Sequence, residues 1–151
     1  MGGSIKSVLV AASIAALAAC ASSGERATFR VPESSTAVTV ERTPMHAYLA
    51  EYHRSVITEI QGRPASRAEM FPDTGGYSRA NLYRLDAQRV LLRDADSSYT
   101  IDVTTGTVSK DAERRIAGTF LGSFDVDGSK RWLFIPARDR PELPTEFLGG
   151  S

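Results

Sequence analysis

Residues 43–61 read TPMHAYLAEYHRSVITEIQ, and this stretch decides which fold class the sequence predicts. Its apolar side chains recur at the i, i+3, i+4, i+7 spacing that places them on one face of an α-helix. They are Met45, Tyr48, Leu49, Tyr52, Val56 and Ile60. Thr43 and Pro44 suit a helix start, and Gly62 suits a helix end. We therefore expect one amphipathic helix over residues 43–61.

From residue 81 onward the apolar period changes from that of a helix to two, which is the period of a β-strand. The predicted strands cover residues 81–86, 89–93, 99–103, 107–108, 120–126 and 131–135. Turn signals separate them at Thr104-Thr105-Gly106 and at Asp127-Gly128. The sequence thus predicts an α+β fold, in which one N-terminal amphipathic helix packs on a small antiparallel β-meander of four to six strands.

Two segments lack this regularity. Residues 62–80 are rich in Gly and Pro and are expected to form a long loop. Its apolar residues Met70, Phe71 and Tyr77 either pin the loop to the body of the domain or form a lid that contacts a ligand. The Pro-rich C-terminal segment begins at residue 136, and its apolar side chains are expected to fold back over the face of the sheet that the helix leaves uncovered. Those side chains are Leu143, Phe147 and Leu148.

The N-terminus has the organisation of a signal peptide, with Lys6 before an apolar run over residues 7–17. That run is too short to cross a bilayer as a helix. It ends in LAAC at residues 17–20, which resembles the lipobox of bacterial lipoproteins. The resemblance covers residues 1–20 and implies that Cys20 becomes the first residue and carries acyl chains such as palmitate. Ala21, in place of an aspartate, implies the outer membrane, facing the periplasm.

The overall composition sets further limits. The chain has 151 residues, with 18 basic and 18 acidic side chains and a single cysteine. A balanced charge argues against a nucleic-acid partner, and one cysteine excludes an internal disulfide or a cysteine-based zinc site. We divide the chain into a signal peptide at 1–19, a lipidated tether at 20–42, and a single α+β domain at 43–148. Within the tether, residues 37–41 alternate and form either an edge strand or extended linker.

No arrangement for nucleophilic or zinc chemistry emerges. His46 and His53 are seven residues apart, or about 10 Å along a helix, which is too far for both to bind one metal ion. The sequence has no Gly-x-Ser-x-Gly motif of a serine hydrolase. A single histidine acting as a base or pH sensor is the alternative to two surface histidines.

Acidic pairs and aromatic residues give equally little support for catalysis. Asp94/Asp96 and Asp125/Asp127 resemble parts of a calcium loop but lack the closing glutamate, so we interpret them as turn residues. Aromatic side chains along the strands are expected in the core, with a stacking platform as the alternative. We therefore expect no enzyme, no metal and no cofactor.

Binding is the function that this pattern favours. We expect an outer-membrane-anchored periplasmic lipoprotein that is a non-catalytic binding or assembly accessory of the envelope, with membrane lipid and an envelope protein as partners. A periplasmic inhibitor or exclusion protein that blocks an enzyme or channel, with loop 62–80 as its insert, is the alternative. Aromatic and arginine side chains dominate interface energetics, so the expected partner-binding residues lie in and beside this loop. They are Arg67, Met70, Phe71, Tyr77 and Arg79.

Overall fold

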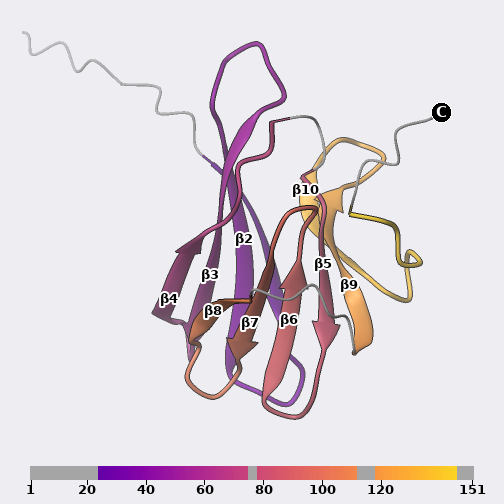
Figure 1. Cartoon of the computed structure of the whole chain (residues 1–151). Coiled ribbons are helices and arrows are strands. Elements are labelled where there is room, and N and C mark those ends of the chain that lie inside the picture. The colour runs from indigo at the N-terminus through magenta and orange to yellow at the C-terminus, as the bar shows by residue number, and fades with distance from the viewer. Residues whose placement is uncertain (1–23, 75–77, 112–117, 146–151) are drawn as a thin grey trace, which may run out of the picture.

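Ten antiparallel strands in two sheets make up the fold of the computed structural model, which describes residues 24–74, 78–111 and 118–145 (Figure 1). Within these ranges there is no helix, so the chain is all-β and the α+β prediction is wrong. The first sheet has the order β1-β2-β3-β4 and the second the order β10-β9-β5-β6-β7-β8. The first four strands are β1 (Glu25–Arg30), β2 (Thr36–Pro44), β3 (Tyr52–Ile60) and β4 (Arg63–Glu69).

The second sheet contains the strands that the sequence predicted from residue 81 onward. They are β5 (Ala80–Arg84), β6 (Arg89–Arg93), β7 (Ser98–Asp102), β8 (Val108–Asp111), β9 (Thr119–Val126) and β10 (Trp132–Pro136). Strands β5 to β8 form a meander, and β9 then pairs with the free side of β5. The prediction of an antiparallel sheet here is confirmed, although its order is not that of a simple meander.

The predicted helix over residues 43–61 is instead the end of β2, a loop, and β3. Strand β3 contains three consecutive β-branched residues, Val56, Ile57 and Thr58, which favour extended backbone. Its inward side chains alternate at 54, 56 and 58, and all three are buried. Tyr48 of the expected helix stripe is 97% exposed. Gln61 and Gly62 have φ values of 52° and 75°, the signature of a two-residue type I′ hairpin turn rather than a helix cap.

Part of the expected tether also belongs to the domain. Residues 25–30 form β1 and residues 36–44 form β2, so of the expected tether the structure leaves only residues 20–24 before the first strand. Ala27 is buried, and Phe29 packs against the core from the same strand. Charged and hydroxyl residues at the alternate positions made this strand look like a linker in the sequence.

The predicted hairpin turns are present. Gly106 takes a φ of 71° between β7 and β8, as its place in Thr104-Thr105-Gly106 predicted. Between β9 and β10 the turn is longer than the two residues expected from Asp127-Gly128. Asp127 carbonyl accepts from Lys130 N–H at 3.0 Å, and Lys130 has a φ of 62°, which is the geometry of a three-residue loop with a bulge.

The two sheets face each other across one core, and their edges also meet. The buried apolar side chains of both sheets form a single cluster that includes Val38, Val40, Val56, Leu82, Leu92, Ile101 and Phe124. Strand β1 contacts β10, where the ring centroids of Phe29 and Phe134 are 4.3 Å apart. Strand β4 approaches β8, and Thr58 donates to the Gly106 carbonyl nearby. The result is a sandwich with contact between the sheets at both sides.

Candidate functional site

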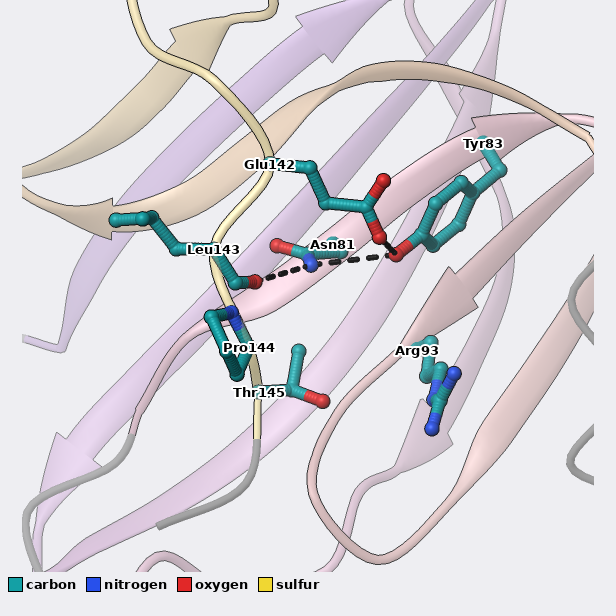
Figure 2. Close-up of a pocket in the computed structure, with 7 residues that line it drawn as sticks. All are labelled: Asn81, Tyr83, Arg93, Glu142, Leu143, Pro144 and Thr145. Atoms are coloured by element: carbon teal, nitrogen blue, oxygen red, sulfur yellow. Dashed lines mark hydrogen bonds between the residues drawn. The ribbon is translucent and has the colours of Figure 1, made fainter. Parts of the chain in front are cut away.

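A half-open pocket of about 140 Å³ lies between the outer face of the six-stranded sheet and the C-terminal segment (Figure 2). The side chains that line it come from β5, β6 and that segment. They are Asn81, Tyr83, Arg93, Glu142, Leu143, Pro144 and Thr145.

The strand period explains why polar groups gather on this face. Leu82 and Leu92 point into the core, so their neighbours in sequence point outward. Asn81 pairs directly with Arg93 across β5 and β6, which places both side chains on the same outer face, together with Tyr83.

Three side-chain hydrogen bonds hold the C-terminal segment over the sheet. Asn81 Nδ2 donates to the Leu143 carbonyl at 2.8 Å, and Arg79 Nη1 donates to the Pro144 carbonyl at 2.6 Å. Tyr83 donates from its hydroxyl to Glu142 Oε1 at 2.6 Å. Residues up to 145 fold back over the outer face of the second sheet as expected, but polar bonds hold them there, and the first sheet, not a helix, covers the inner face. Phe147 and Leu148 lie outside the described residues.

Asp125 joins the same segment to β9. Its Oδ2 accepts from Arg79 Nε and from Arg140 Nη2, both at 2.7 Å. Ser123, two residues earlier on the same face, donates to Asn81 Oδ1 at 2.7 Å. The segment is therefore fixed by charged and neutral bonds over most of its described length, and it forms a stable wall of the pocket.

The electrostatics of the pocket favour binding over acid–base chemistry. Burial, and then the hydrogen bond to Glu142, raise the pKa of Tyr83 to about 12. The phenol thus stays protonated near neutral pH and acts as a fixed donor, whereas a general base needs a pKa near the working pH. The pocket also holds a guanidinium from Arg93 and a carboxylate from Glu142. Its volume is below the roughly 300–1,000 Å³ of pockets that enclose whole drug-sized ligands.

A second polar cluster lies inside the sandwich. Arg54 of β3 donates from Nη2 to Asp94 Oδ2 at 3.1 Å and to the Phe71 carbonyl at 2.6 Å. Arg42 of β2 lies 4.4 Å from the ring centroid of Tyr52 and 4.6 Å from that of Trp132. The side chains of Arg54 and Asp94 are 1% and 0% exposed, so this cluster is a structural tie and not a surface for a ligand.

The residues predicted to bind a partner do not form one patch. Met70 is 5% exposed and packs in the core, so its assignment to the surface is wrong. Phe71 is 49% exposed beside it. Arg67 lies on the outer face of the first sheet and pairs with Glu41 at 3.0 Å, whereas Arg79 lies on the outer face of the second sheet. Tyr77 and the proposed lipidation site Cys20 lie outside the described residues.

The histidines and acidic pairs considered in the sequence lie at the surface or in hydrogen-bonded structure. His46 and His53 are both exposed, and His46 Nε2 is 3.4 Å from Glu51 Oε2. Asp94 Oδ1 accepts from the N–H groups of Asp96 and Ser97, and Asp127 Oδ1 caps the β9–β10 turn, so these are turn residues as predicted. The prediction is wrong for Asp125, which lies in β9 and binds Arg79 and Arg140. Across residues 24–74, 78–111 and 118–145, no three His, Cys, Asp or Glu side chains gather as metal ligands would.

No pattern in the sequence indicates this pocket. Its groups alternate along β5 and β6 like ordinary surface residues, and their partners on the C-terminal segment lie about sixty residues away. No protein family, curated protein or solved structure matches the chain. Function must therefore be argued from the site itself.

Proposed function

We propose that the protein is an acyl-anchored lipoprotein of the bacterial outer membrane that acts by binding, as an accessory or assembly subunit of the envelope. In this proposal the pocket under the C-terminal segment receives a polar side chain or terminal group of an envelope partner. Cys20 supplies the attachment to the membrane, on its periplasmic side.

The observation that carries the binding role is the set of fixed polar groups in the pocket. Arg93 and Glu142 place a cation and an anion within a small volume, and Asn81 and Tyr83 hold one wall of the pocket through their bonds to Leu143 and Glu142. Such a set recognises a hydrogen-bonding group by complementarity. A pocket of this volume has room for one group of a partner protein. The rest of the partner's surface would then lie against the surface of the sandwich.

The anchor is supported by the LAAC sequence at residues 17–20 and by the short distance to the domain. In the part of the chain that the structure describes, no helix has the length and apolar character needed to span a bilayer. Acyl chains on one cysteine would then hold the protein at the membrane, since each buried methylene contributes about 0.8 kcal/mol.

The inhibitor alternative has lost the feature on which it depended. It required residues 62–80 to form a long insert that could enter a target. Residues Arg63–Glu69 form β4 instead, and Met70 is buried. No other described feature favours an inhibitor over an accessory.

A photo-crosslinking experiment tests the binding role. A photoreactive amino acid replaces Pro144, which is exposed at the pocket, or Ser109, which is exposed on β8 of the same sheet. We expect one discrete envelope protein to crosslink from position 144 and not from 109, and Arg93→Gln to remove the product. Equal crosslinking from both positions, or a product unaffected by Arg93→Gln, would contradict the pocket as the binding site.

Intact mass tests the anchor independently. The protein extracted from membranes should begin at residue 20 and carry acyl chains, and Cys20→Ser should abolish both the added mass and membrane retention. An unacylated wild-type protein would refute the anchor.

A further inference from the structure

The four large hydrophobic side chains that are exposed in the described residues all lie at one end of the sandwich. They are Tyr48, Leu49, Phe71 and Val126, with exposed fractions of 97%, 58%, 49% and 36%. The strand registers place them there. Tyr48 and Leu49 follow Pro44, which pairs with Tyr52, so they lie beyond the last pair of β2 and β3.

Phe71 and Val126 lie at the same end. The Phe71 carbonyl is bonded to Arg54, which is level with Arg42 near the end of β2. Val126 pairs with Trp132, whose ring contacts Arg42. Among the described residues at the opposite end, which include 31–35 and 85–88, no large hydrophobic side chain is exposed.

The connection between β2 and β3 projects farthest. Met45 N–H donates to the Glu51 carbonyl at 2.8 Å, which closes the base of the loop. Residues 46–50 read HAYLA, and all five are exposed. We call these five residues the tip. Figure 1 shows the loop rising beyond the strands at the top of the view. A projecting run of Ala-Tyr-Leu-Ala without an acidic or lysine side chain is unusual for a surface in water.

The chain enters the domain at this same end. Glu25 pairs with Arg42, and Gly24 lies against Thr43. From Cys20 to Gly24 there are four Cα–Cα steps, which span at most about 14 Å. From Thr43 to Tyr48 there are five residues, which advance at most about 17 Å along an extended strand. An acylated Cys20 and the tip can therefore reach the same plane.

From this geometry we propose that the tip enters the membrane interface and, together with the acylated Cys20, fixes the orientation of the sandwich on the bilayer. This inference depends on the proposed acyl anchor. Tyr48 provides an aromatic ring with a polar hydroxyl, which is the side-chain type enriched at bilayer interfaces. Leu49 provides an apolar group that enters the acyl-chain region below that interface. Lys130 and Arg131, exposed in the β9–β10 turn at this end, would face the headgroups.

A bilayer fits the tip better than a protein surface does. A stable protein interface buries about 800 Å² on each partner, commonly with a well-packed centre. Two exposed side chains at the end of one narrow loop present far less apolar surface than that. A lipid interface closes around such a projection without a shaped receptor.

The test uses single thiols in the full acylated protein. Cys20 is the only cysteine and is blocked by acylation, so Leu49→Cys or the control Ala87→Cys adds one reactive thiol. Ala87 is exposed in the β5–β6 loop at the opposite end. Each thiol carries an environment-sensitive fluorophore, and the protein is reconstituted in phosphatidylethanolamine–phosphatidylglycerol vesicles. We expect blue-shifted emission and quenching by doxyl-labelled lipid at position 49, and neither change at position 87.

The other outcomes are decisive as well. A probe at position 49 that is as hydrated and unquenched as the probe at 87, in protein whose mass shows acylation, would overturn the proposal. A probe at position 49 that is shielded from water in native envelopes, but not in vesicles that contain this protein alone, would assign the tip to a protein partner. That result would also overturn the proposal. Failure of the anchor would be recognised separately, because an unacylated mass and labelling at Cys20 would appear in the wild-type protein.

Discussion

Arg54 and Asp94 join the two sheets inside the sandwich through a bond of 3.1 Å between Nη2 and Oδ2, with both side chains almost fully removed from water. Burial raises the pKa of Asp94, although the charge of Arg54 opposes this shift. Arg54 supplies an opposite charge to this carboxylate, and the N–H groups of Asp96 and Ser97 supply further compensation.

Arg54→Met should lower the free energy of unfolding by about 3 to 5 kcal/mol at neutral pH, because it leaves a buried carboxylate without its partner. The pKa of Asp94 in the folded state should rise further above its unfolded value. A raised folded pKa contributes stability at low pH that is lost as pH increases, so the loss should be smaller in acid than at neutral pH. Urea unfolding of wild type and variant at both pH values measures this. Adding Asp94→Asn should recover part of the loss, and no recovery would contradict the explanation.

Glycines 62 and 106 offer a matched comparison, since their φ values are 75° and 71°. Gly62→Ala should cost only about 1 kcal/mol, the conformational penalty of a left-handed residue, because nothing lies within 4 Å of the added Cβ. Gly106→Ala should cost clearly more, since its Cβ would stand 2.6 Å from the Cβ of Ala65. Thermal unfolding of the two variants measures these losses of stability. Equal losses would show that β4 moves away from the added methyl group at position 106 with little cost.

Trp132 is the only tryptophan, is 6% exposed, and donates from Nε1 to the Val40 carbonyl at 3.0 Å. Trp132→Ala should cost about 3 to 5 kcal/mol, as expected for a large buried aromatic side chain. Trp132→Phe should cost less, since most of the packing remains while the hydrogen bond, worth about 0.5 to 1.5 kcal/mol, is lost. Circular dichroism can follow unfolding in both variants. Unchanged unfolding midpoints would mean that the packing of Trp132 in β10 against the first sheet does not contribute to stability.

Glu142→Ala should loosen the C-terminal segment, which Asn81 and Arg79 still hold, and lower the pKa of Tyr83 from about 12, because the carboxylate that favours the protonated phenol is gone. Ultraviolet titration against a Tyr83→Phe variant assigns that phenol, and limited proteolysis measures loosening of the segment. Glu69→Ala, which removes an exposed carboxylate from the other sheet, is the control and should change neither. A Tyr83 that titrates as in wild type would show that the hydrogen bond is dispensable.

Sequence patterns predicted the strands of the second sheet and missed β3, where most inward positions are polar. In β6 and β9, side chains such as Leu92 and Phe124 make the two-residue period visible. In β3 the inward residues are Arg54, Val56 and Thr58. Only one of the three is apolar, so a helical spacing of other residues gave the stronger signal. Arg54 is stable inside because of Asp94, forty residues later, and no local pattern contains that information.

The candidate site was hidden for a related reason. Arginines 67 and 79 are close in sequence, and the Gly- and Pro-rich composition of residues 62–80 predicts one loop for both. Strand β4 then takes Arg67 to one sheet, while Arg79 is bonded to Asp125 of the other. The pocket forms only when the C-terminal segment crosses β5, which depends on pairings across about sixty residues.

The contacts of β1 with β10 and of β4 with β8 bear on how the protein behaves at high local concentration. An open sheet edge exposes N–H and C=O groups that can recruit a strand from another copy, which is a route to aggregation. Anchored proteins share a single surface and meet one another often. In the described sandwich each terminal strand of one sheet has a terminal strand of the other beside it. This arrangement limits access to the backbone at those edges, so if the proposed anchor gathers copies on one membrane, it opposes polymerisation through their strands.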